Sequence, residues 1–539
     1  MDHPKIDDSP PPAPSSVGWR QRVLEREASA TAGAAASVQA EQAEGAGGTR
    51  AGTVMRTLVW SAALLLTMFM LFVIARLPWL GDLGIHAATI ERLRANLIHP
   101  GSPQVDAATD SPYYSPWTVL LGFVAGATGL DVFTVLRIGA LISLSLLLTG
   151  VWHFTRTLSS RRAAPPLAVL CLLLLWGPPW LAWSGFLELG SLTLTISYPS
   201  TFVIALSFHF WALLTKALRA AASWPAFLGL GLLWAVILLS HQYSGVVATF
   251  GALALLLGAR PWPARETLLR LGAGIVLGVA WIAMWPYYSF FSLFGFEGLE
   301  EIHRPLYSNL PTRFGIVLVG VIALVFRWRR DRRDPLVIFF ALGTAMVAVG
   351  DLTGHWSWGR VLPAAIIPAQ LATALAMAEG RKVFLALSSA ALLSGAWAQV
   401  GTLGYAVPAD MLPQAVRQKT WPTWQGLKWM TRWVKPGDTV MSSPTANVMI
   451  PAYGAYTVAP GYDDIFLPDQ QERYAAVGRF FASGTPREEQ LDILGRYKVK
   501  WVLRWGFEGG LPPDDAALRL VDIGPDGREL YQVVGREKA

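Results

Sequence analysis

The feature that most constrains this chain is a series of long apolar runs separated by polar connections. The first run, residues 57–75, contains no charged residue and is long enough to cross a bilayer as a helix. Charged residues make up only 15% of the 539 positions, against about a quarter in a soluble domain. A polytopic α-helical membrane protein of about eleven spans is therefore predicted. The ten further spans are expected near residues 132–154, 165–183, 200–218, 224–241, 243–259, 267–290, 314–328, 335–350, 361–379 and 383–406.

Basic residues gather in alternate connections between these runs. Cytosolic connections of membrane proteins carry an excess of Lys and Arg, so the alternation predicts a cytosolic N-terminus. An odd number of spans then places residues 407–539 outside, with the chain in the plasma or inner membrane. The net charge of +7 follows from the same bias, and no nucleic-acid partner is expected. The basic residues concerned are Arg156, Arg161, Arg162, Lys216, Arg219, Arg260, Arg265, Arg270, Arg327, Arg329, Arg330, Arg332, Arg333, Arg381 and Lys382.

The two ends of the chain differ in composition from its apolar centre. Residues 1–55 are rich in Ala, Gly, Ser, Pro and Glu without apolar periodicity, which predicts a disordered cytosolic tail. Residues 56–406 form the predicted transmembrane domain, and residues 407–539 a small extracytoplasmic α/β domain. In that domain, strands are predicted at 438–443, 455–458 and 499–505, and helices at 421–434, 469–481 and 486–497.

The first exterior segment, residues 77–131, carries an unusual acidic start. In 79-WLGDLGIHAATIERLRANL-97, apolar residues recur at helical spacing and charges fall on another face, as in a helix that lies in the membrane interface. A carboxylate at Asp82, this close to hydrocarbon, is costly unless it has a use. The apolar run 116–130 is short, and counting it as a span would invert every later connection. We expect it to be a second embedded or interfacial helix.

Polar residues expected near the outer boundary suggest a site for an anionic lipid substrate. Arg recognises phosphate through its planar donor fork, and a carboxylate can take a proton from an attacking hydroxyl. Structural roles stay open for several of them. Asp82 could cap its helix, His86 could pair with Asp82 at i,i+4, and Arg137 could reach the interface. The candidates are Asp82 for catalysis and His86, Asp110, Arg137, His241, Tyr243, His355 and Arg360 for substrate binding.

This arrangement resembles the GT-C superfamily of membrane glycosyltransferases. The stretch 110-DSPYYSPWTVLLG-122 is similar to that family's acidic, Tyr- and Pro-containing approach to a second interfacial helix. The stretch 132-VFTVLRIGAL-141 resembles its arginine-bearing span. The resemblance implies that the exterior aspartate is the catalytic base, which by position is Asp82. It also implies a donor sugar carried on a polyprenyl phosphate.

The leading hypothesis is therefore an inverting glycosyltransferase, transferring a hexose or pentose from a polyprenyl-phosphate donor to an extracytoplasmic glycan, lipid or protein. The alternative is a transporter or flippase for lipids or glycolipids. Transporters usually show repeated halves and keep ionisable residues near the midplane, whereas this chain shows no repeat and its charges gather at one face. A scaffold whose C-terminal domain binds a partner is a third option. Whether a divalent cation is required stays open.

Overall fold

The computed structural model describes residues 50–178, 182–295, 300–380 and 382–534. The chain divides into two compact units, residues 1–61 and 62–539, and the following concerns the second unit unless stated otherwise. Most of the predicted N-terminal tail lies outside the described residues. Helix α2 (Arg50–Arg76) already begins at Arg50, so residues 50–55 of that predicted tail are helical.

Each of the eleven predicted spans contains a helix, and the structure confirms a mostly helical membrane protein. In the described part of the chain, seven helical segments are long and apolar enough to cross a membrane. They are Thr53–Arg76 within α2, α5 (Val132–Leu158), α8 (Pro199–Arg219), α11 (Arg265–Ala283), Leu310–Arg330 ending in α14 (Leu318–Arg330), α15 (Pro335–Thr353) and Trp356–Ala378 ending in α16 (Pro363–Ala378). Shorter apolar helices occupy the other four, so the count of eleven stays a prediction: α6 (Ala164–Leu174), α9 (Trp224–Ser240), α10 (Gln242–Leu257) and α17 (Lys382–Ala398).

Helix α6 ends well before the predicted limit of its span at residue 183. Gly177 and Pro178 follow it closely, and proline removes a backbone donor and disfavours helical geometry in the preceding residue. The chain therefore leaves the helix after Leu174, and residues 175–178 and 182–188 form an irregular segment before the short helix α7 (Leu189–Thr195). This irregular segment supplies part of the site described below.

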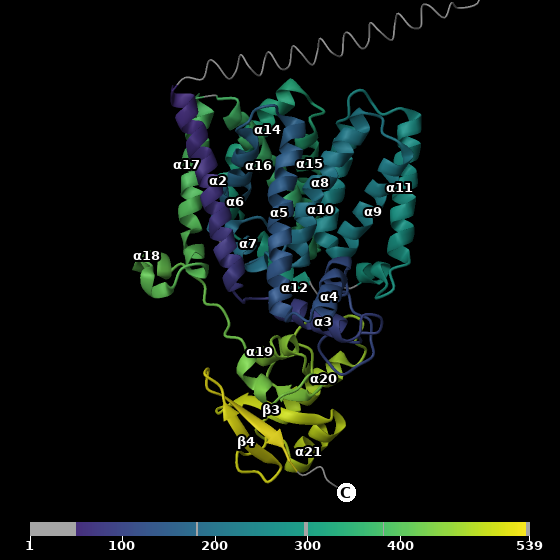
Figure 1. Cartoon of the computed structure of the whole chain (residues 1–539), viewed down its shortest axis with the longest axis vertical. Coiled ribbons are helices and arrows are strands. Elements are labelled where there is room, and N and C mark those ends of the chain that lie inside the picture. The colour runs from purple at the N-terminus through teal and green to yellow at the C-terminus, as the bar shows by residue number, and fades with distance from the viewer. Residues whose placement is uncertain (1–49, 179–181, 296–299, 381, 535–539) are drawn as a thin grey trace, which may run out of the picture. The chain divides into compact units, whose positions relative to one another are not determined.

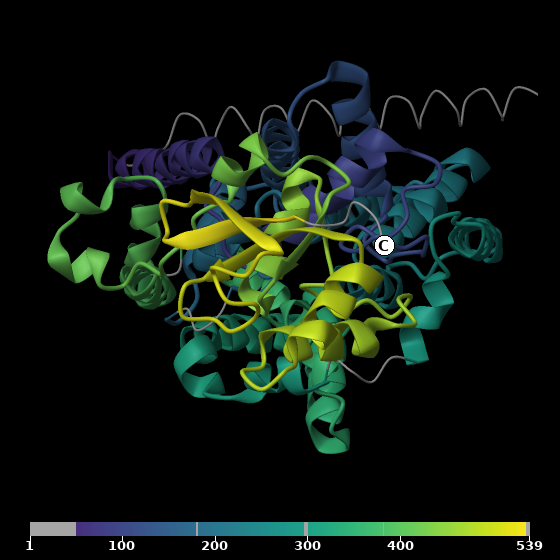
Figure 2. The ribbon, with the colours of Figure 1, turned by 90° about the horizontal axis from the view of Figure 1, so that it is seen from below.

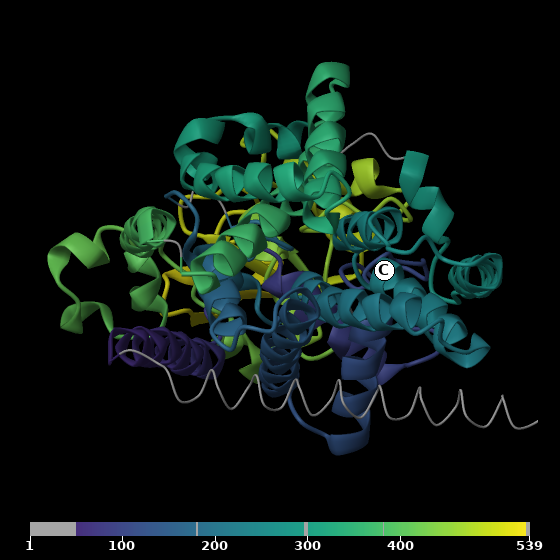
Figure 3. The ribbon, with the colours of Figure 1, turned by 90° about the horizontal axis from the view of Figure 1, so that it is seen from above.

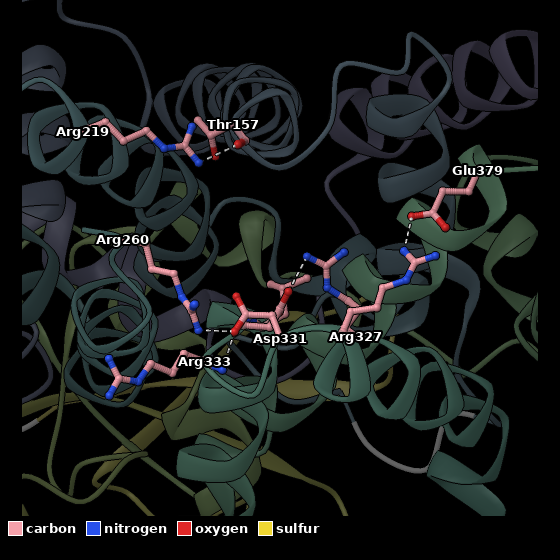
Figure 4. Close-up of polar contacts among 10 residues, drawn as sticks. Thr157, Arg219, Arg260, Arg327, Asp331, Arg333 and Glu379 are labelled. Carbon is pink, nitrogen blue, oxygen red and sulfur yellow. Dashed lines mark hydrogen bonds and ion pairs between the residues drawn. The ribbon is translucent and has the colours of Figure 1, made fainter. Parts of the chain in front are cut away.

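All five basic connections meet at one end of the helical bundle (Figures 1, 3 and 4). Arg219 donates a hydrogen bond to the carbonyl of Thr157 at 3.1 Å, which joins the first two connections. Arg270 donates to the carbonyl of Ala222 at 2.6 Å, Arg260 pairs with Asp331, and Arg330 with Glu379 at 3.5 Å. The alternation read from the sequence is thus matched by connections that share one end.

The segment 77–131, which the sequence predicts to be exterior, forms two short helices at the opposite end. Helix α3 (Leu83–Ala95) packs against α4 (Pro116–Thr128), and both adjoin the C-terminal domain (Figures 1 and 2). That domain contains a five-stranded sheet in the order β2-β1-β3-β5-β4. Its strands are β1 (Thr439–Ser442), β2 (Tyr456–Thr457), β3 (Val499–Trp505), β4 (Leu518–Ile523) and β5 (Arg528–Val533), and its longer helices are α20 (Gln470–Phe481) and α21 (Arg487–Arg496).

The small C-terminal α/β fold agrees with the prediction, with two differences. The hairpin β4–β5 was not predicted; β3 pairs in parallel with β1 and antiparallel with β5. The predicted helix at 421–434 is wrong, since only a 3-10 turn at Lys428–Arg432 forms there. Pro422 and Gly426 disfavour a helix at its start, and the amide of Trp424 donates instead to the carbonyl of Trp79 at 2.8 Å.

One hydrophobic core joins α3 and α4 to the C-terminal sheet. It contains Leu83 and Ile90 from α3, Trp117 from α4, Val440 from β1 and Leu503 from β3, all buried. Because these residues share one core, α3 is held between the bundle and the C-terminal sheet. The start of α3, where Asp82 lies, is therefore a buried junction of several segments.

Candidate active site

Asp82 occupies the residue before α3 but does not cap the helix with its side chain. Its backbone has φ −75° and ψ 6°, and no hydrogen bond reaches its carboxylate from any residue that the structure describes. Two other aspartates show what capping looks like in this chain. Asp131 accepts from the amides of Phe133 and Thr134 at 3.1 Å, and Asp334 from Leu336 at 2.9 Å. The structural alternative of a side-chain cap at Asp82 therefore has no support in the geometry.

The carboxylate of Asp82 lines a cavity of about 400 Å³. The wall combines this one carboxylate with hydroxyl groups and three aromatic side chains. A cavity of this size holds a small polar ligand with a few well-placed polar contacts. The lining residues are Leu80, Gly81, Asp82, Ala182, Ser184, Thr195, Tyr198, Trp421 and Trp424.

Arg360 is hydrogen-bonded to Ser184, which lines the same cavity. It lies in the 3-10 helix η4 (Trp356–Val361), and its Nη2 donates to the carbonyl of Ser184 at 2.8 Å and to its hydroxyl at 2.6 Å. The guanidinium also lies over the rings of Trp183 and Tyr243, 5.3 and 5.2 Å from their centroids. Its Nε is buried and donates to none of the described residues, so part of the fork is unused.

Two opposing effects act on the pKa of the Asp82 carboxyl. Burial raises the pKa of its carboxyl above the usual value, and the positive charge of Arg360 lowers it, with burial the larger effect. A carboxyl with a raised pKa is a stronger base once ionised. Arg360 favours that ionised form and so opposes the effect of burial on the Asp82 carboxyl.

His86 lies one turn after Asp82 and is buried. Its ring centroid is 4.6 Å from that of Tyr198 and 6.2 Å from that of Tyr113, and its Nδ1 has no hydrogen-bond partner among the described residues. Burial lowers the pKa of His86 to about 3, so the imidazole is neutral near pH 7. An ion pair between His86 and Asp82, which the i,i+4 spacing had left open, is therefore disfavoured.

Two other predicted residues lie around Arg360 with structural contacts of their own. The Nδ1 of His241 accepts from the amide of Ser244 at 3.2 Å and is 2.9 Å from its hydroxyl, which caps α10. Tyr243 supplies one of the rings beneath the guanidinium of Arg360, and its ring centroid is also 5.7 Å from that of His303. Both residues belong to the surroundings of Arg360 and do not line the cavity.

The structure places three predicted binding residues elsewhere. Asp110 is exposed, in the segment before α4. Arg137 is half-buried, and its Nε donates to the carbonyl of Ala75 at 3.0 Å. His355 is exposed, with its Nδ1 2.9 Å from the hydroxyl of Thr353. None of the three lines the cavity of Asp82.

Several lining residues were not predicted from the sequence. Ser184 and Tyr198 lie in a connection without Lys or Arg, which carried no charge to mark it. Trp421 and Trp424 were assigned to a helix that does not form. No described residues form a group of three or more His, Cys, Asp or Glu that could hold a metal ion.

Comparison with known proteins gives a likeness of fold. No protein-family model and no curated protein sequence matches the chain. The structure is similar to that of the arabinofuranosyltransferase AftD from Mycobacteria, with a TM-score of 0.56 and 15% identity over 90% of this chain and 40% of that one. A second structure of that enzyme, a variant, gives a TM-score of 0.56 and 16% identity over 89% and 42%. The structure of the Archaeoglobus fulgidus oligosaccharyltransferase gives a TM-score of 0.44 and 13% identity, over 83% of this chain and 69% of that one.

The chain thus spans 40% of the length of the arabinofuranosyltransferase that it resembles. At 15% identity this likeness concerns the fold alone. It covers 90% of this chain.

Proposed function

We propose, from the GT-C fold that this chain has and from the cavity around Asp82, that it transfers a sugar from a polyprenyl-phosphate donor to an extracytoplasmic acceptor. The acceptor class comprises glycans, lipids and proteins that meet the membrane from outside. The observation that carries the proposal is the carboxylate of Asp82. It lines a cavity of about 400 Å³, makes no capping bond, and is near a fastened guanidinium.

In the proposed reaction Asp82 is the general base. It takes the proton from an acceptor hydroxyl while that oxygen forms a bond to the anomeric carbon of the donor sugar. The bond between that carbon and the phosphate oxygen breaks, and the polyprenyl phosphate leaves with the electron pair. One displacement inverts the anomeric configuration. Phosphate is a good leaving group, so no covalent enzyme intermediate is needed.

Arg360 suits the phosphate in this proposal. Its Nη2 is held by Ser184, which fixes the direction of the guanidinium plane, while its Nε has no partner among the described residues. A planar guanidinium can place two donors on the phosphate oxygens. Charge that develops on the leaving phosphate would then be stabilised by a group already in position.

The orientation in the membrane is part of the proposal. The basic connections share one end of the bundle, whereas α3, which Asp82 directly precedes, and the C-terminal domain lie at the other (Figure 1). The positive-inside bias then places the basic end in the cytosol and the cavity outside. The prenyl chain of the donor would lie among membrane lipids, with its sugar phosphate at the cavity.

The test is a turnover assay on the purified full-length chain. Polyprenyl-phosphate-linked arabinofuranose, mannose and glucose are supplied separately with a mixture of cell-envelope glycans, and released polyprenyl phosphate is measured. Release with one donor supports the proposal. If no donor turns over, while the same protein in liposomes moves labelled polyprenyl-phosphate sugar between leaflets, the chain is a flippase and the proposal fails.

A further inference from the structure

Three consecutive carbonyls just before Asp82 are each held by a different part of the chain. The carbonyl of Trp79 accepts from the amide of Trp424, in the segment after the last span, at 2.8 Å. The carbonyl of Leu80 accepts from the hydroxyl of Tyr198, before α8, at 2.9 Å. The carbonyl of Gly81 accepts from the hydroxyl of Tyr462, in the C-terminal domain, at 2.8 Å.

These bonds are important because no described residue forms a hydrogen bond with the Asp82 carboxylate itself. Its direction depends on the backbone that precedes it, and that backbone turns sharply at Gly81, which has φ +69°. A left-handed glycine is a flexible point in the chain unless its peptide groups are fixed. The bond from Tyr462 fixes the carbonyl of that glycine, one residue before the carboxylate.

Tyr462 is itself firmly placed. Gln104, from the exterior segment, accepts with its Oε1 from the amides of Gly461 and Tyr462 at 2.8 Å, and donates with its Nε2 to the carbonyl of Tyr462 at 2.8 Å. Gln104 is only 1% exposed, so these bonds are shielded from water. The backbone on both sides of Tyr462 is therefore tied to the segment that leads from α3 to α4.

A second connection holds the same domain against α3. Arg92 is buried, donates to the carbonyls of Gly454 and Ala455 at 2.9 and 2.7 Å, and lies 3.6 Å over the ring of Tyr456. Three backbone carbonyls of the C-terminal domain, at 454, 455 and 462, thus face donors from the exterior segment. Buried hydrogen bonds of this kind fix one relative position of the two segments.

We infer that the C-terminal domain is part of the catalytic centre, with Tyr462 as the positioning residue that directs the Asp82 carboxylate into the cavity. The inference rests on the proposed role of Asp82 as base. Trp424 and Tyr198 hold the two preceding carbonyls and also line the cavity. Tyr462 does not line it, so its hydroxyl can be tested without removing a wall of the cavity.

The experiment compares Tyr462→Phe with Tyr474→Phe in the full-length protein. Tyr474 is a matched control, because it is a partly buried tyrosine of the same domain whose hydroxyl donates to Asp463 at 2.9 Å and not to Gly81. We expect Tyr462→Phe to lower kcat about tenfold with little change in donor KM or melting temperature, since small misplacements of a reacting group are costly. Tyr474→Phe should keep the parent values.

A double mutant separates positioning from general support. Combined with Asp82→Asn, the Tyr462→Phe change should have no further effect on the residual rate, because the group that it directs is gone. A tenfold loss in that background as well would overturn the inference. If Asp82→Asn abolishes turnover but Tyr462→Phe turns over at the parent rate, the inference fails while the proposed function stands. If Asp82→Asn retains full turnover, the failure belongs to the proposed function.

A measurement that does not depend on enzymatic activity completes the test. Hydrogen–deuterium exchange of a peptide covering residues 79–86 should become about tenfold faster in Tyr462→Phe and stay unchanged in Tyr474→Phe, since a held carbonyl restrains local opening. Unchanged exchange in Tyr462→Phe would show that its hydroxyl does not hold the turn, and would overturn the inference whichever donor turns over.

Discussion

Arg360 lowers the pKa of the Asp82 carboxyl, against the larger effect of burial, which raises it. The two residues are far apart in the sequence, one before α16 and the other before α3. Arg360 is fastened to Ser184, and Ser184 and Asp82 line the same cavity. This relationship links the charge of the proposed phosphate ligand to the basicity of the proposed base, and it can be measured.

The first prediction concerns the pH dependence of turnover. Asp82 acts as a base only when ionised, so kcat/KM should fall as pH drops through its raised pKa. In Arg360→Gln the lowering influence is lost, the pKa of Asp82 rises further, and the fall should begin at higher pH. The measurement is kcat/KM against pH. Arg137→Gln, at an arginine outside the cavity, should keep the parent profile. An unshifted profile in Arg360→Gln would separate Arg360 from Asp82.

A second prediction concerns the geometry of Arg360. Lysine keeps the positive charge but offers one ammonium in place of a planar fork, and it cannot stack in the same way over Trp183 and Tyr243. Loss of a charge-assisted hydrogen bond costs about 1.5–3 kcal/mol. Arg360→Lys should therefore raise the donor KM by about tenfold to a hundredfold, measured from initial rates. Unchanged KM and turnover would remove Arg360 from the phosphate site.

A third prediction concerns orientation in the membrane. Gly484→Cys, at an exposed turn of the C-terminal domain, should react with an impermeant maleimide on intact cells. Ser160→Cys, in the first basic connection, should react only after permeabilisation. The native Cys171 is buried and should give little background. The reverse pattern would place the cavity in the cytosol.

A fourth prediction concerns Glu188, buried beside α7. Burial raises its pKa to about 8, whereas the carboxyl of an unfolded chain titrates near 4.5. Between these values the unfolded chain loses the proton and the folded chain keeps it, so the folded state is penalised as pH rises from about 5 to 8. Glu188→Gln removes this penalty. Its melting temperature should exceed the parent's by several degrees at pH 8 and by little at pH 5. Glu301→Gln, at an exposed carboxylate, should show no such difference.

Much of the fold could be predicted from the sequence, because a helix that crosses the membrane needs a long apolar run and the cytosolic connections are rich in Lys and Arg. The start of α3 and Arg360 were readable too, since charged groups near hydrocarbon are conspicuous. The partners of these residues were not. Ser184, Tyr198 and Tyr462 are uncharged and reach the site only through contacts across long stretches of chain. The short strands β4 and β5 also carry polar, partly exposed residues whose pattern resembles that of a loop.

The last prediction concerns Asp82 itself. Asparagine has nearly the same shape but cannot accept the proton of the acceptor, and loss of a general base costs about 10²–10⁴-fold in rate. Asp82→Asn should therefore lower kcat by that factor with donor KM unchanged. Asp110→Asn, at an exposed carboxylate outside the cavity, should retain the parent kcat.

Stability distinguishes the base from a helix cap. Loss of a side-chain cap costs about 1 kcal/mol, which should appear when Asp131→Ala removes the bonds to Phe133 and Thr134. The carboxylate of Asp82 makes no such bond, and burial raises its pKa, so Asp82→Asn loses no cap and should melt at or above the parent temperature. A variant that folds normally and turns over slowly fits a base. A variant that melts at a lower temperature and retains its turnover would show that Asp82 is a helix cap and not the base.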